Sequence, residues 1–260
     1  MQYQKELESA LDVTRRAGSL AMRFFTEGIA AEEKSDGSPV TAADRECETL
    51  IGRYLSETFP DDGILGEEGT FRQTTSGRRW LIDPIDGTRD FVRRTNFWCT
   101  QLALQVHARV VLGVIYFPCL DEIYYAAAGA GCFCNETRAH LSDVSQLNRA
   151  ILAVSGFPSV WHMWPENSVR YLTQNCWAVR GYGGCYDIAM LLRGKCDIWL
   201  SGSGEEWDYA PARILAEESG ATFLLRDGSD RINGKHCLIC PPALADELRR
   251  VLVIPSLRMQ

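Results

Sequence analysis

The chain of 260 residues lacks a long hydrophobic run, and it contains no stretch of about eighteen apolar residues that could span a bilayer. Its first six residues, Met1 to Glu6, mix polar and charged side chains and lack the apolar segment of a secretory signal. We therefore expect no membrane partner and an unexported, cytoplasmic protein.

An excess of positive charge is also absent. The sequence has 27 Lys and Arg against 34 Asp and Glu, a net charge of −7. The field around such a chain has the wrong sign for binding a phosphate backbone, so nucleic acid is not an expected partner. A hydrophobic fraction of 46% with 23% charged residues excludes disorder and is typical of a folded chain.

Histidine is scarce, whereas cysteine is not. The four histidines form no His-Glu-x-x-His pattern, and this argues against a zinc hydrolase of that type. The ten cysteines occur in a chain without a secretory signal, so we expect reduced thiols. Cys237 and Cys240 have no second pair at zinc spacing, which favours buried structural thiols over a metal site.

Hydrophobic periodicity and turn residues divide the chain into two parts. The first, residues 1–145, is predicted to be a helical and antiparallel-sheet subdomain, with helices over 5–25 and 41–58 and strands over 64–65, 80–82, 100–106, 110–117 and 122–126. The second, residues 146–260, is predicted to be an α/β subdomain, with strands over 151–154, 197–200, 221–225 and 237–240 and helices over 185–192 and 208–219. The length suits one two-part catalytic unit.

Acidic residues recur where predicted strands end. Glu67 follows the short strand at 64–65, and Asp83 and Asp86 follow the strand at 80–82. Asp-Pro and Asp-Gly steps are ordinary turn sequences, so each acid alone is a weak signal. Pro84 favours an extended backbone at Asp83, and a carboxylate three residues later can return to the same side of a tight turn.

The segment at 83–88 also offers groups for phosphate. Gly87 allows a close backbone approach, and the amides of Gly87 and Thr88 form an anion site if they begin a helix. Oxygen ligands suit Mg²⁺, and two such ions roughly 3.5–4 Å apart can stabilise the attacking and leaving oxygens of a displacement. An EF-hand, a P-loop and a Gly-x-Ser-x-Gly turn are absent from the sequence. The pattern favours metal-assisted hydrolysis by water.

Four ordered motifs resemble those of the inositol monophosphatase superfamily of Mg²⁺-dependent, lithium-sensitive phosphomonoesterases. They lie at residues 40–44, 66–68, 80–88, and 207–210 with 218–221. The resemblance implies a layered αβαβα sandwich of the inositol monophosphatase and fructose-1,6-bisphosphatase type, of α+β or α/β class. It also implies two or three Mg²⁺ ions per site, a small phosphorylated metabolite as substrate, and a homodimer.

The resemblance further implies the metal ligands. Glu67, Asp83 and the Ile85 carbonyl would hold one ion, and Asp83, Asp86 and Asp208 would hold a second. Glu67 would also face a third, weakly bound ion. Most ligands would thus come from residues 1–145, whereas Asp208 and the substrate-facing residues would come from residues 146–260.

Two further residues are implied to act on water. Thr88, hydrogen-bonded to Asp44, would orient the water that attacks phosphorus, with Glu67 assisting. Gly87 and Thr88 would bind the phosphate. For Asp44 the alternative is a capping acid only, because residues 41–44 also match a capping box.

The alcohol part of the substrate is less clearly specified. Relatives that accept inositol phosphate or histidinol phosphate usually place an acid seven residues before the last metal aspartate, and here that residue is Ser201. Glu205 or Glu206 is the alternative acid in the same loop. The candidate substrate contacts are therefore Asp86, Ser201, Glu205 and Asp208. Residues 36–41 and 182–186 favour the histidinol-phosphatase-like branch.

Two alternatives to hydrolysis of histidinol phosphate or inositol monophosphate are considered. Residues 88–91 resemble the Gly-Thr-Lys-Glu-Phe motif of nucleotide 3′-phosphatases, so adenosine 3′,5′-bisphosphate is one alternative substrate, with Arg93 and Arg94 for its second phosphate. The other is a catalytically silent metal- or phosphate-binding regulator. The aromatic residues Phe157, Trp161 and Trp164, in a predicted loop, either cover a substrate ring or pack inside the protein.

Overall fold

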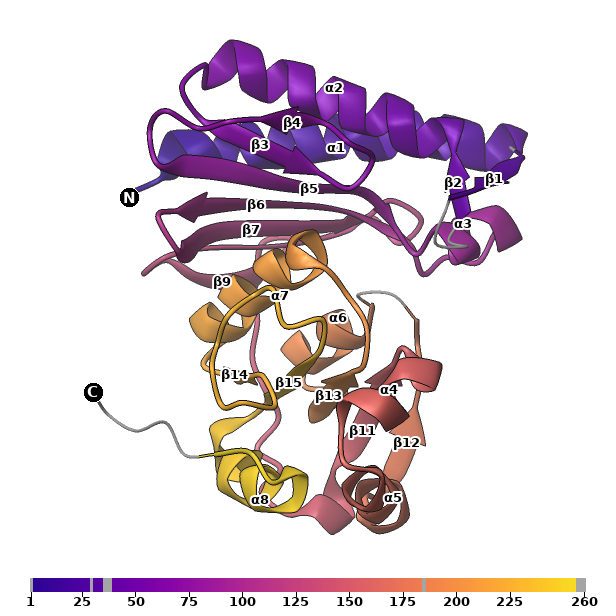
Figure 1. Ribbon diagram of the computed structural model, residues 1–260, viewed down its shortest axis with the longest axis vertical. Helices are drawn as coiled ribbons and strands as arrows, with labels where there is room; N and C mark the ends of the chain where they lie inside the picture. The colour runs from indigo at the N-terminus through magenta and orange to yellow at the C-terminus, as the bar shows by residue number, and fades with distance from the viewer. Residues whose placement is uncertain (1, 29, 35–38, 184–185, 256–260) are drawn as a thin grey trace.

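The computed structural model describes residues 2–28, 30–34, 39–183 and 186–255. These residues form five layers, which are helices, an eight-stranded sheet, helices, a five-stranded sheet and helices (Figure 1). The αβαβα sandwich expected from the sequence motifs is therefore confirmed. The turn predicted at 35–38 and residues 184–185 lie outside the described part of the chain.

The first layer consists of α1 (Gln4–Glu27) and α2 (Ala42–Thr58), which cover one face of the larger sheet (Figure 1). Both predicted helices are confirmed. The hydroxyl of Thr41 accepts the amide of Asp44 at the start of α2, and the Asp44 carboxylate accepts the amide of Thr41. This capping box, also predicted, fixes the Asp44 side chain at the helix N-terminus.

The larger sheet has the strand order β10-β9-β8-β7-β6-β5-β3-β4, and it is antiparallel except where β3 runs parallel to β5. Side chains of β5 alternate: Trp80 and Ile82 pack toward α1 and α2, whereas Leu81 packs toward the middle helices. The strands are β3 (Gly63–Gly66), β4 (Phe71–Arg72), β5 (Arg78–Asp86), β6 (Cys99–Val106), β7 (Arg109–Phe117), β8 (Glu122–Ala127), β9 (Gly131–Cys134) and β10 (Thr137–Arg138).

Three short elements lie outside this sheet in the first half of the chain. The pair β1 (Ala31–Glu33) and β2 (Pro39–Thr41) is antiparallel and leads into α2. The helix α3 (Thr88–Arg93) begins directly after β5, at the place where the sequence predicts a helix N-terminus.

The middle layer consists of α6 (Tyr186–Leu192) and α7 (Glu206–Ser219), which lie between the two sheets (Figure 1). Gly113 on β7 permits the close approach of α7, because a Cβ at this position would lie 2.8 Å from the Cα of Pro211. The sequence predicted that α7 begins at Asp208. It begins at Glu206 instead, with Asp208 as its third residue.

The smaller sheet has the strand order β12-β11-β13-β15-β14, with β11 parallel to both its neighbours and the other pairs antiparallel. Its strands are β11 (Ile151–Ser155), β12 (Ala178–Arg180), β13 (Ile198–Ser201), β14 (Thr222–Leu224) and β15 (Cys237–Cys240). The last layer contains η1 (Leu147–Arg149), α4 (Phe157–Met163), α5 (Glu166–Asn175) and α8 (Pro242–Leu252).

The prediction of a loop for the aromatic segment is therefore wrong, because residues 157–163 form α4. Pro158 stands in the first turn of this helix, where its missing amide costs no hydrogen bond. Trp164 is buried and its Nε1 donates to the carbonyl of Ser201 at 2.9 Å, whereas Phe157 and Trp161 are exposed. The division into subdomains at residue 145 stays a prediction. No helix in the described part of the chain is long and apolar enough to cross a bilayer.

Candidate active site

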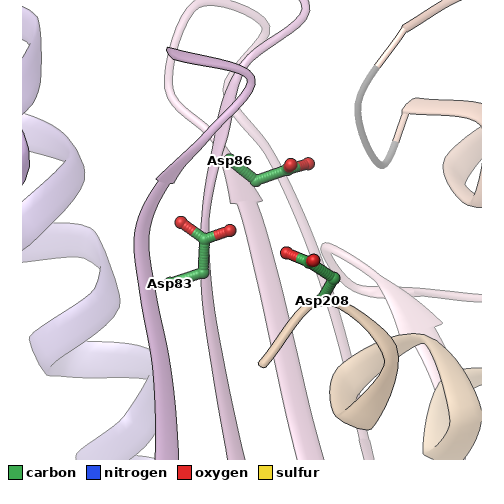
Figure 2. A group of neighbouring side chains, drawn as sticks. All are labelled: Asp83, Asp86 and Asp208. Carbon is green, nitrogen blue, oxygen red and sulfur yellow. The ribbon is translucent and has the colours of Figure 1, made fainter. Parts of the chain in front are cut away.

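Asp83, Asp86 and Asp208 meet in a cavity of about 580 Å³ that elements of both sheets line. The first two come from the end of β5 and the third from the first turn of α7. One carboxylate oxygen of each residue lies within 4.8 Å of the others, and Figure 2 shows the three groups pointing toward one another. The fold thus joins three of the predicted metal ligands.

An irregularity in β5 directs Asp83 and Asp86 to the same side. Asp83 pairs with Gln101 and Asp86 with Cys99, so three steps along β5 match two along β6. Residues three apart on a regular strand face opposite sides, and the bulge returns Asp86 to the side of Asp83. Gly87 then adopts a left-handed conformation with a φ of 85°, where a Cβ would lie 3.1 Å from a backbone carbonyl oxygen.

The three carboxylates lie close together in a poorly solvated place. Burial raises the pKa of Asp83 well above its usual range, and the charges of the surrounding acids raise it further. Burial and the neighbouring Asp86 raise the pKa of Asp208 to about 8. The Oδ1 atom of Asp83 is buried and has no hydrogen-bond partner among the described residues. A divalent cation would relieve both the repulsion and the missing contact, so these residues fit a hard metal ion.

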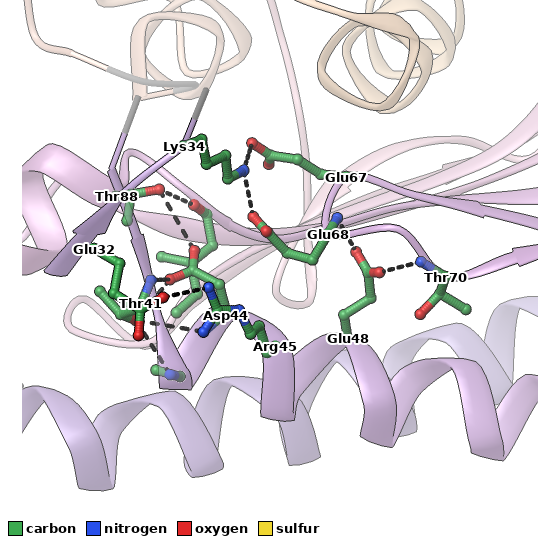
Figure 3. A network of polar contacts seen from close by, with 12 residues as sticks. Glu32, Lys34, Thr41, Asp44, Arg45, Glu48, Glu67, Glu68, Thr70 and Thr88 are labelled. Atoms are coloured by element: carbon green, nitrogen blue, oxygen red, sulfur yellow. Dashed lines mark hydrogen bonds and ion pairs between the residues drawn. The ribbon is translucent and has the colours of Figure 1, made fainter. Parts of the chain in front are cut away.

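Glu67 lines the same cavity from the turn after β3, but it lies in an ion pair (Figure 3). The Nζ of Lys34 lies 2.9 Å from Oε1 of Glu67 and 2.6 Å from Oε1 of Glu68. Burial opposes the charge of Lys34, but the hydrogen bonds to both glutamates outweigh it and raise its pKa. The roles of Glu67 at the metal and at the water stay predictions.

Thr88 lies between Asp44 and the backbone, at the start of α3 (Figure 3). Its hydroxyl lies 3.4 Å from Oδ1 of Asp44 and 3.3 Å from the carbonyl oxygen of Ile85, and it can donate to either. The other oxygen of Asp44 accepts the capping hydrogen bonds of Thr41. Asp44 therefore caps α2 and also contacts Thr88. Burial raises its pKa to about 6, although the bonds from Thr41 oppose the shift.

The candidate substrate contacts Ser201 and Glu205 line the cavity, but their side chains already have partners within the protein. The hydroxyl of Ser201 is buried, 2.9 Å from the hydroxyl of Tyr209 and 3.1 Å from the carbonyl of Ser203. The carboxylate of Glu205 pairs with Lys235 at 2.8 Å, and the backbone amide of Glu205 donates to Oδ2 of Asp208 at 2.6 Å at the start of α7. The alternative acid, Glu206, forms an ion pair with Arg79 and does not line the cavity.

Lys34 and Gln101 are among the polar residues of the cavity that sequence reasoning missed. Lys34 directly follows β1 and belongs to no sequence pattern that marks it as a site residue. Gln101 did leave a signal, because it is a polar residue on a strand face that also carries Cys99 and Ala103, both buried. Its position beside Asp83 depends on strand register, which the sequence does not specify.

The model of the inositol monophosphatase family matches residues 2–254. The chain belongs to this family. It is 34% identical to a histidinol-phosphatase of Chlorobaculum parvum over 216 residues, 83% of each chain. It is 28% identical to inositol monophosphatase 1 of Solanum lycopersicum, covering 85% of this chain and 84% of the relative. Both names describe phosphoric monoester hydrolases, and the chain is an enzyme of this class.

Solved structures agree with this assignment. The Thermotoga maritima IMPase superposes with a TM-score of 0.87 at 26% identity, over 96% of this chain and 97% of its own. The extragenic suppressor protein suhB of Bartonella henselae gives a TM-score of 0.88 at 25% identity, over 96% and 98% of the two chains. Of the two segments that favour the histidinol-phosphatase-like branch, residues 36–38 and 184–185 lie outside the described part of the chain.

Proposed function

We propose that this chain is a Mg²⁺-dependent phosphomonoesterase that hydrolyses a small alcohol monophosphate of the histidinol phosphate or inositol monophosphate type. Water is the attacking group, and no covalent intermediate forms. The names of relatives at 34% and 28% identity support this substrate class. The two or three ions and the homodimer implied by the sequence motifs belong to the same proposal.

The observation that carries the proposal is the trio of Asp83, which is buried, with Asp86 and Asp208, which are partly buried. We propose that these residues hold Mg²⁺, together with Glu67 and the carbonyl of Ile85 from the same cavity. When bound, Mg²⁺ supplies Lewis acidity: it acidifies water and offsets charge on the phosphoryl and leaving oxygens. The raised pKa values of Asp83 and Asp208 indicate that the protein alone does not stabilise their charges.

Thr88 and Asp44 are proposed to orient the attacking water. With a pKa of about 6, Asp44 is mostly ionised at neutral pH and can accept a hydrogen bond from the hydroxyl of Thr88. The oxygen of Thr88 then presents its lone pairs to the cavity and accepts a hydrogen bond from water. A water held in this way keeps its own lone pair free to attack phosphorus.

The phosphate and the alcohol are proposed to occupy opposite parts of the cavity. The amides of Gly87 and Thr88 stand at the beginning of α3, where amides lack partners within the helix and suit the phosphate oxygens. Ser201 and Glu205 line the side formed by the second sheet and are proposed to face the alcohol, with Asp86 and Asp208 between the two parts. The nucleotide alternative is less favoured, because neither Arg93 nor Arg94 lines the cavity.

The test is phosphate release by the purified full chain with Mg²⁺ and a panel of monoesters. The panel contains histidinol phosphate, inositol 1-phosphate, two sugar phosphates and adenosine 3′,5′-bisphosphate. We expect one alcohol monophosphate to exceed the nucleotide by about a hundredfold in kcat/KM, which corresponds to about 2.8 kcal/mol. Preference for the nucleotide would reverse the substrate assignment. Metal binding without turnover of any monoester would favour the silent regulator.

A further inference from the structure

Gln101 is a buried amide that no other described residue satisfies. It lies on β6, it is 0% exposed, and it lines the cavity that holds the three aspartates. Neither its Nε2 nor its Oε1 has a hydrogen-bond partner among the described residues. Buried side-chain polar atoms nearly always have partners, so an amide with both ends unsatisfied requires an explanation.

The residue that faces Gln101 on the neighbouring strand also has a buried polar atom without a partner among the described residues. Gln101 pairs in register with Asp83, and the Oδ1 of Asp83 also lacks a partner among the described residues. Side chains that are paired across neighbouring antiparallel strands stand on the same face, with Cβ atoms about 4.5–5.5 Å apart. A glutamine amide can donate through Nε2, and a carboxylate oxygen can only accept. The two groups therefore match in position and in chemistry.

We propose that Gln101 is a positioning residue for Asp83: when the divalent cation is bound, its Nε2 turns to donate to the carboxylate of Asp83 and orients that carboxylate for the cation. This inference rests on the metal site of the proposed function. Groups that hydrogen-bond to metal ligands fix the ligand orientation, and their loss typically weakens metal binding about ten- to a hundredfold. The Oε1 of Gln101 remains available to accept a hydrogen bond inside the loaded cavity.

The same chain provides a matched control. Gln105 lies four residues further along β6 and does not line the cavity. Its amide is satisfied, because Oε1 accepts Nε of Arg79 at 2.6 Å and Nε2 donates to the carbonyl of Ala108 at 3.4 Å. Replacing either glutamine by methionine keeps the length of the side chain and removes the amide.

The experiment measures Mg²⁺ affinity by calorimetric titration of the full chain for wild type, Q101M and Q105M, and melting temperatures in a chelator. We expect Q101M to raise the Kd for Mg²⁺ about tenfold or more. Its melting temperature without metal should be equal to or above that of wild type, because an unsatisfied buried amide is removed. Q105M should melt at a lower temperature, because Arg79 keeps Glu206 but loses its bond to Gln105, and its Kd for Mg²⁺ should be unchanged.

An unchanged Kd for Mg²⁺ in Q101M would overturn the inference. A lower melting temperature without metal beside that unchanged Kd would make Gln101 a structural residue. A raised KM for the substrate at saturating Mg²⁺ beside it would assign Gln101 to the substrate. Q101L repeats the test if Q101M does not fold.

These outcomes are separable from the proposed function. If wild type binds Mg²⁺ but releases no phosphate from any monoester, the proposed function fails, while the titrations of Q101M still test the positioning role. If wild type is an active phosphatase and Q101M binds Mg²⁺ like wild type, only the inference about Gln101 fails.

Discussion

Asp187 is a buried carboxyl group near the candidate active site, although it does not line the cavity. It lies in the first turn of α6, and its Oδ1 accepts the amide of Tyr182 at 3.1 Å. Its Oδ2 is buried without a partner among the described residues. Burial raises the pKa of Asp187 to about 7, the bond from Tyr182 opposes the shift, and the charge of Asp86 adds to it. Folding therefore favours the protonated form of Asp187 relative to the unfolded chain.

This shift gives Asp187 a predictable effect on stability. A carboxyl group whose pKa is higher in the folded state stabilises the protein at low pH, and this contribution is lost as pH rises through the folded pKa. The free energy of unfolding of D187N relative to wild type should therefore increase by about 1.4 kcal/mol per pH unit between about pH 5 and pH 7. The side-chain amide oxygen of this variant keeps an acceptor for the backbone amide of Tyr182.

Urea unfolding at several pH values, without added metal, measures this difference. The curves of wild type and D187N should diverge as pH rises and run parallel above about pH 8. A difference that stays constant from about pH 5 to about pH 8 would show that Asp187 does not carry the raised pKa.

The helix α2 fixes the position of Glu67, because it holds the turn that carries this residue. The carboxylate of Glu48 on α2 accepts the amides of Glu68 and Thr70, both at 2.7 Å (Figure 3). Gly66 leaves room for this contact, since a Cβ there would lie 2.4–2.6 Å from the Glu48 carboxylate atoms. The same helix holds Asp44 one turn earlier. The helix α2 thus positions two of the predicted catalytic groups.

We expect E48A to destabilise the protein by about 3 kcal/mol, because two partly buried amides lose a carboxylate partner. Phosphate release should also fall, since the turn bearing Glu67 is no longer held. The control is E57A on the same helix, where the exposed pair with Arg53 should contribute less than about 0.5 kcal/mol. Denaturant unfolding with a phosphate-release assay measures both effects. An E48A variant as stable and active as E57A would contradict this role of α2.

Elements with strong local signals could be predicted from the sequence. The hydrophobic periodicity of α1 and α2 and the capping box at Thr41 are local features, and they appear as expected. The start of α7 was misplaced because its cap is Glu205, and glutamate is not among the usual capping residues. Asp83 and Asp86 could also be predicted, because residues 83–88 form one continuous local motif. Gln101 could not be linked to Asp83, because cross-strand register depends on the whole sheet.

The whole molecule assembles the site from its two sheets through α7. This helix packs between the sheets and brings Asp208 of the second half to Asp83 and Asp86 of the first (Figure 1). The net charge of −7 is partly concentrated at this junction. We therefore expect the metal-free cavity to repel a phosphate monoester and the loaded cavity to attract it. The homodimer and the cytoplasmic location stay predictions.

The most direct test of this account is phosphate release across a Mg²⁺ titration for wild type and D83N, with D12N on the exposed face of α1 as control. Wild type and D12N should gain activity as Mg²⁺ is added. D83N should fold, melt in chelator at or above the wild-type temperature, and lose activity more than about a hundredfold, because it lacks a buried metal ligand. A D83N variant that keeps Mg²⁺-dependent phosphate release at the wild-type level would contradict the account.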